Sequence, residues 1–96
     1  MVNITETAQE RLIELLAKNV PKIPNVFLRI VYSKAKPNTF ALVYDREREN
    51  DHIAVTDKRG EKVLLIDQVV AEEIDGMVVD YHKTGNDAYF TLNHGT

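Results

Sequence analysis

Four apolar residues near the start of the chain recur at the spacing of one helical face. They are Ala8, Leu12, Leu15 and Leu16. Thr5 comes just before them and is a favourable N-cap, and Glu6 beside it suits the positive end of a helix dipole. Pro21 prevents the helix from continuing, because proline lacks a backbone N–H. The pattern therefore predicts one amphipathic helix between Thr5 and Pro21.

The rest of the chain contains short apolar runs rich in β-branched and aromatic residues, which are typical of strands. The runs are Val26–Tyr32, Phe40–Tyr44, His52–Thr56, Val63–Ile66, Met77–Tyr81 and Ala88–Leu92. The first run is apolar on both faces except at Arg29, which predicts a central strand. The third run alternates, so we expect Ile53 and Val55 to face the core.

Polar segments separate these runs and predict turns. They are Asp45–Asn50, which is highly charged, Asp57–Gly60 and Thr84–Asp87. Asp67 is suited to cap a short helix over Gln68–Ile74, and Gly76 lies just beyond its end. The predicted order is one helix, four strands, a short helix and two strands. Short turns favour antiparallel pairing, and the helical crossover introduces mixed pairing.

Length and composition narrow the class of protein. The 96 residues predict a single domain, 1–96, and the net charge of −3 argues against binding to nucleic acid. No apolar run approaches the roughly 20 residues needed to cross a bilayer, so we expect no membrane span. No signal peptide is visible, which predicts a cytoplasmic protein. The chain has no cysteine, which excludes disulfides, a catalytic thiol and thiolate ligation of a metal.

A combination of motifs resembles one known family. The most distinctive is Ile74-Asp75-Gly76-Met77-Val78-Val79-Asp80-Tyr81, with Asp67 nine residues before Gly76. Together with Leu28-Arg29-Ile30 it resembles the HesB-like family of A-type iron–sulfur cluster carriers. The resemblance implies an α+β fold that is mostly β. We expect a small β-sandwich or flattened barrel of about six or seven mixed strands, with an N-terminal helix and one short helix.

The sequence departs from that family where its chemistry resides. The resemblance implies three cluster-binding cysteines, and aligning on Phe40 places Ala35 at the first. Alanine offers no lone pair to a metal, and Lys34 and Lys36 would repel Fe²⁺. The remaining cysteine pair would follow Thr96, where this sequence ends. The chain therefore reads as a degenerate, cysteine-free relative, and we expect no cofactor.

The candidate metal ligands that remain are His94, His82 and Asp80, since imidazole and carboxylate groups bind iron or zinc. Their spacing matches no metal motif, so surface histidines and a structural hydrogen bond at Asp80 are the simpler interpretation. Lys34 and Lys36 form a small basic loop that suits contact with an acidic protein partner or simply a solvated loop.

No combination of residues predicts an enzyme. The leading hypothesis is an accessory factor in iron–sulfur protein biogenesis, which binds assembly or recipient proteins through its surface. One alternative is a small metal-binding protein with His and Asp ligands. Another is a structural homodimer that pairs through a strand edge.

Overall fold

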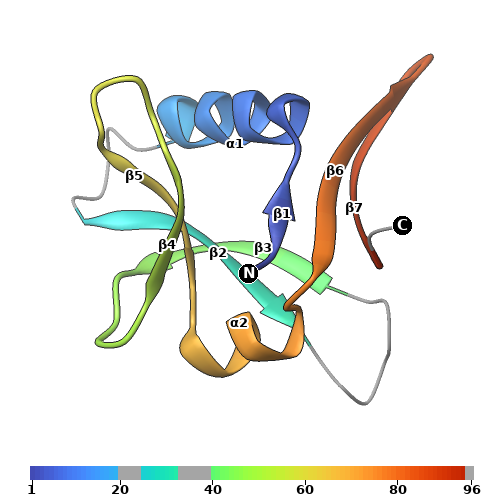
Figure 1. Cartoon of the computed structure of the whole chain (residues 1–96). Helices are drawn as coiled ribbons and strands as arrows, with labels where there is room; N and C mark the ends of the chain where they lie inside the picture. Colours follow the sequence, from blue (N-terminus) through green and yellow to red (C-terminus); the bar gives the residue numbers. More distant parts are fainter. Residues whose placement is uncertain (20–24, 33–39, 95–96) are drawn as a thin grey trace.

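The computed structural model describes residues 1–19, 25–32 and 40–94, which form seven strands and two helices (Figure 1). In chain order these are β1 (Asn3–Ile4), α1 (Glu6–Asn19), β2 (Val26–Tyr32), β3 (Phe40–Arg46), β4 (His52–Thr56), β5 (Lys62–Ile66), α2 (Gln68–Glu73), β6 (Met77–Thr84) and β7 (Asp87–His94). The predicted order of elements is confirmed, with the short strand β1 in addition. Pro21 lies outside the described residues.

The strands form two mixed sheets. The larger has the order β3-β2-β5-β4, in which β2 is antiparallel to β3 but parallel to β5. The smaller has the order β1-β6-β7, in which β1 is parallel to β6 and β6 and β7 form an antiparallel hairpin. The α+β class and mixed pairing are therefore confirmed. The strands in the described part of the chain form open sheets and do not close into a barrel.

Helix α1 begins at a side-chain cap, as predicted. The backbone N–H of Ala8 donates to Thr5 Oγ1 at 3.2 Å, which satisfies a donor that the first helical turn would leave free. Ala8, Leu12 and Leu16 on one face are buried. The helix contacts β2, β5 and β6, so it joins the two sheets (Figure 1).

The short helix α2 also has the predicted ends. Asp67 accepts a hydrogen bond from the backbone N–H of Val69 at 2.9 Å. Gly76 follows the helix with a φ of +81°, in the left-handed region that glycine occupies with least strain. In the view of Figure 1, α1 lies above β2 and β3, and α2 lies below them.

The buried side chains of both sheets and of α1 form one apolar cluster. Its strand members include Leu28, Ile30, Val63, Leu64, Ile66, Met77, Val79 and Leu92. Strands β2 and β5 lie in the middle of the larger sheet, so the prediction of a central strand at Val26–Tyr32 is confirmed. Within the described residues, no helix is long and apolar enough to cross a membrane.

One expectation for β4 is wrong. Val55 is buried at 3% exposure, but Ile53 is 47% exposed. Ile53 pairs with Leu65 and Val55 with Leu64, so Ala54 is an extra residue opposite β5. This bulge breaks the alternation of side chains between the two faces, which places Ile53 outside the core.

Candidate functional site

The candidate site residues are only partly within the described structure. Ala35, Lys34 and Lys36 lie outside the described residues. The residues on either side are placed: Tyr32 ends β2 and Phe40 begins β3, and the two are paired in the antiparallel ladder. The structure therefore fixes where this segment leaves and rejoins the larger sheet.

The other three candidate ligands belong to the smaller sheet, but they do not converge. His82 pairs with Tyr89, whereas His94 pairs with Met77 at the other end of the hairpin. His82 and Met77 are five positions apart on β6, which corresponds to roughly 17 Å along a strand. Among the residues that the structure describes, no group of three or more His, Cys, Asp or Glu side chains could hold a metal ion.

Asp80 connects the start of α1 to β6. Its Oδ1 atom accepts hydrogen bonds from the Thr5 hydroxyl and from the backbone N–H of Tyr81, each at 2.8 Å. The hydrogen bond from Thr5 is the main reason that the pKa of Asp80 lies below its ordinary value. Thr5 therefore caps α1 and holds Asp80 with the same hydroxyl group, which supports the interpretation of Asp80 as a structural residue.

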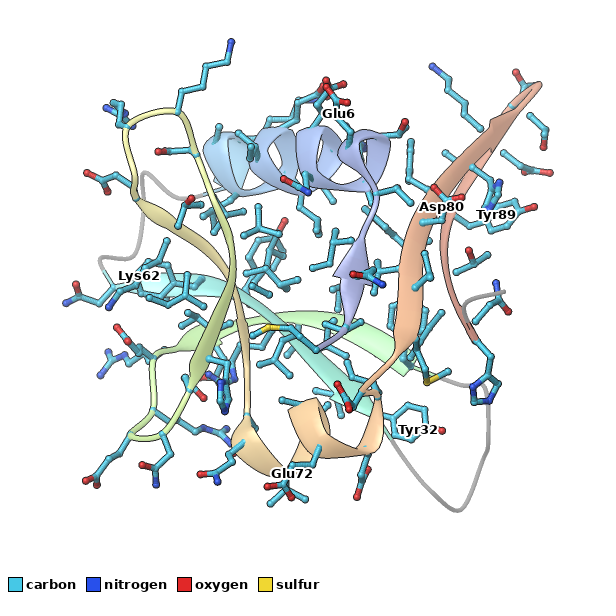
Figure 2. All side chains as sticks on the ribbon, viewed as in Figure 1. Glu6, Tyr32, Lys62, Glu72, Asp80 and Tyr89 are labelled. Carbon is cyan, nitrogen blue, oxygen red and sulfur yellow. The ribbon has the colours of Figure 1, made fainter. Side chains whose placement is uncertain are left out.

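His82 completes a small polar cluster on this hairpin. Its Nε2 atom lies 3.5 Å from Asp80 Oδ2, and its ring stacks on Tyr89 with centroids 5.5 Å apart. Figure 2 shows Asp80 on β6 and Tyr89 on the neighbouring strand. His82 and Asp80 would supply at most two ligands, fewer than the three or four that zinc sites use.

A buried ion pair on the larger sheet was missed by sequence reasoning. The side chains of Arg29 and Asp51 are 5% and 0% exposed and are joined by two hydrogen bonds. Arg29 Nη2 lies 2.8 Å from Asp51 Oδ1, and Nη1 donates to Oδ2. The backbone N–H of Arg48 also donates to Oδ2, at 2.6 Å. Asp51 thus anchors the β3–β4 connection against the middle of β2.

Electrostatics stabilises the charged state of this pair. The hydrogen bond from Arg29 lowers the pKa of Asp51, and the backbone N–H of Arg48 adds to the effect, while burial opposes it.

One signal of this ion pair was present in the sequence, because an arginine inside an apolar strand requires a buried acceptor. The charged segment after β3 contains several carboxylates, and the pattern does not select among them. Arg29 is thus a buried structural residue, apart from any basic surface.

Comparisons with known proteins identify the fold. No protein-family model matches the sequence, and neither does any curated protein sequence. Two solved structures with this fold are of proteins whose descriptions refer to iron–sulfur clusters. Escherichia coli SufA, involved in the biosynthesis of iron–sulfur clusters, matches with a TM-score of 0.66 and 23% identity over 97% of this chain and 84% of SufA.

A second solved structure, IscA with the [2Fe-2S] cluster, has a TM-score of 0.58 and 18% identity. That match covers 98% of this chain and 85% of IscA. The fold predicted from the resemblance is thereby confirmed, over nearly the whole chain and in a sequence without cysteine. The likeness defines the fold.

Proposed function

We propose that this protein is a non-enzymatic accessory factor in the maturation of iron–sulfur proteins, and that it acts by binding other proteins. The observation that carries the proposal is the fold of SufA and IscA over 97% or more of the chain, in a sequence with no cysteine. The proposal includes a cytoplasmic location, where iron–sulfur assembly or recipient proteins would be its partners.

The ligand chemistry supports protein binding over transport of a cluster. Iron–sulfur clusters are held mainly by thiolates, and this chain supplies none. Histidine replaces cysteine in some clusters, but His82 and His94 lie at opposite ends of the β6–β7 hairpin. The oxygen Oδ1 of Asp80 already accepts two hydrogen bonds. A cluster would therefore have to be held by other residues or another protein.

A deletion strain tests this function directly. We expect the strain to lose activity of several iron–sulfur enzymes, while enzymes without a cluster stay at wild-type levels. Expression of the wild-type chain should restore the lost activities. The Asp51→Ala variant is a second control. Any failure of this variant to restore the enzyme activities should match its loss of folded protein. Normal activity of iron–sulfur enzymes in the deletion strain would contradict the proposal.

The second candidate is a metal-binding protein, and the contact between His82 and Asp80 at 3.5 Å is the observation in its favour. Anaerobic titration with Fe²⁺ and sulfide, followed by desalting and metal analysis, separates the two functions. The accessory role predicts no retained iron. Stoichiometric iron that the wild type retains and the double variant His82→Ala, His94→Ala loses would favour the metal site.

A structural homodimer is the third candidate, and strand β7 is the element that favours it. Its register with β6 is regular from Asp87 to His94, and no other strand in the described part of the chain pairs with its outer edge. Such an edge can pair with a second copy across a two-fold axis. Light scattering at several protein concentrations distinguishes a dimer from a monomer.

A further inference from the structure

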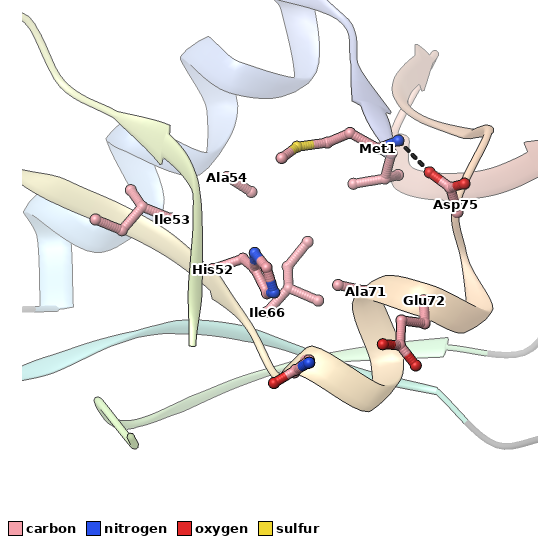
Figure 3. A pocket seen from close by; sticks show the side chains of 10 residues that line it. Met1, His52, Ile53, Ala54, Ile66, Ala71, Glu72 and Asp75 are labelled. Atoms are coloured by element: carbon pink, nitrogen blue, oxygen red, sulfur yellow. Dashed lines mark hydrogen bonds and ion pairs between the residues drawn. The ribbon is translucent and has the colours of Figure 1, made fainter. Parts of the chain in front are cut away.

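A pocket lies where β4, α2 and the N-terminal segment meet, and the sequence did not predict it. Its volume is about 360 Å³, near the lower end of the range for ligand pockets. Ten residues line it: Met1, Val2, His52, Ile53, Ala54, Ile66, Gln68, Ala71, Glu72 and Asp75 (Figure 3). None of them belongs to the strands that carry the candidate metal ligands.

The walls of this pocket are apolar. Val2 and Ile66 are buried at 9% and 1% exposure, whereas Ile53 is 47% exposed and Met1 is 78% exposed. An exposed isoleucine beside buried apolar side chains leaves a surface that a partner's side chain would remove from water. The size of the pocket suits one large aliphatic or aromatic side chain with part of its neighbouring backbone.

The rim of the pocket is acidic. Asp75 pairs with the ammonium group of Met1, which contributes to lowering the pKa of Asp75 (Figure 3). Glu72 has no such partner among the described residues, and neither lysine nor arginine lines the pocket. The Met1–Asp75 pair leaves the carboxylate of Glu72 as the uncompensated charge. A cationic group of a partner would therefore be attracted to the rim.

The way a partner can enter is restricted by the edge of the larger sheet. Strand β4 is at that edge, and its pairing with β5 shifts register between Ile53 and Val55 and again before Thr56. Such irregularities interrupt the row of backbone groups that an added strand would need. The pocket is thus better suited to an inserted side chain than to an added strand.

We propose that this pocket docks a segment of a partner protein in which a large apolar side chain stands next to lysine or arginine. The inference deepens the proposed function, because it rests on protein binding and assigns that binding to one surface. The apolar side chain would lie against Ile53 and Ile66, and the cationic group would lie beside Glu72.

The test uses the ¹⁵N-labelled protein and a five-residue peptide with phenylalanine between two lysines. We expect saturable changes in amide chemical shifts that are confined to β4, α2 and the N-terminal residues. Replacing the phenylalanine by alanine, or both lysines by glutamate, should weaken binding about fivefold or more. In the protein, Glu72→Arg should weaken binding about fivefold, and Ile53→Ala should weaken it by a similar factor.

Two control variants match these changes outside the pocket. Glu10→Arg changes the net charge as Glu72→Arg does, at an exposed position on α1. Val43→Ala shortens an apolar side chain that is 36% exposed on the same sheet, outside the pocket. Both controls should bind the peptide like the wild type.

Three results would overturn the inference. One is the absence of saturable shifts at the pocket with millimolar peptide. Another is binding that Glu10→Arg weakens as much as Glu72→Arg. A third is a dimer that dissociates in Ile53→Ala, since a second copy would then be the occupant. Failed peptide binding would leave the deletion-strain result standing, so the two proposals fail separately.

Discussion

Removing the carboxylate of Asp51 should destabilise the protein more than removing a comparable surface carboxylate. The Asp51→Ala variant leaves the guanidinium of Arg29 in β2, with a side chain only 5% exposed, without its partner. Breaking a buried ion pair by deleting one member costs about 3–5 kcal/mol. The variant also loses the hydrogen bond from the backbone of Arg48. A domain of this size has a total stability of about 5–15 kcal/mol, so the loss would be a large fraction.

The measurement is unfolding in urea, followed by far-ultraviolet circular dichroism, with the free energy of unfolding extrapolated to water. Asp45→Ala is the matched control, because Asp45 lies in the same acidic region and its side chain is 43% exposed. The control should lose much less stability. The double variant Arg29→Met, Asp51→Ala should be more stable than Asp51→Ala alone, because it leaves no buried charge without a partner.

Two results would refute this reasoning. If Asp51→Ala costs no more than Asp45→Ala, the pair does not anchor the β3–β4 connection. The stability losses of Arg29→Met alone and of Asp51→Ala alone can also be compared with the loss of the double variant. If the two single losses add up to the double loss, the two side chains are not energetically coupled. Unchanged m-values across the series are needed for either conclusion, since they show that the same cooperative unit unfolds.

Three further predictions concern acid, a cap and a turn. Folding lowers the pKa of Asp51 below its ordinary value of 3.8, so the contribution of Asp51 to the free energy of unfolding is present above that pH and is lost as the pH falls further. In Asp51→Asn, the free energy of unfolding should therefore fall less steeply as the pH is lowered. Thr5→Ala should cost about 1–2 kcal/mol in urea unfolding, and Thr5→Ser should cost less, because serine keeps the capping hydroxyl. Gly76→Ala should lower the thermal midpoint through about 1 kcal/mol of backbone strain at a φ of +81°. No steric clash adds to this strain, because nothing lies within 4 Å of the position that the alanine Cβ would take.

The features that the sequence predicted well depend on near neighbours in the chain. Thr5 accepts a hydrogen bond from a residue three positions later, and Asp67 from a residue two positions later. Gly76 ends its helix through its own backbone conformation. Caps, turns and apolar periodicity are local in this sense, which explains why the helices and strands were found in the correct order.

The features that the sequence did not predict depend on distant pairings. Asp51 meets Arg29 across 22 positions, and it lies in the β3–β4 connection, where no local pattern distinguishes it from its acidic neighbours. The exposure of Ile53 follows from the bulge opposite β5, which apolar alternation cannot reveal. The pocket needs the N-terminal segment, β4 and α2 together, and no motif records that meeting.

The absence of cysteine affects the chemistry of this fold much more than its stability. The core is an apolar cluster drawn from both sheets and α1, and burial of such side chains is the main favourable term in folding. Thr5 with Asp80 joins α1 to the smaller sheet, and Arg29 with Asp51 holds the β3–β4 connection on the larger sheet. None of these contacts involves a thiolate or a metal. The contacts that hold this fold together therefore do not depend on thiolate ligands.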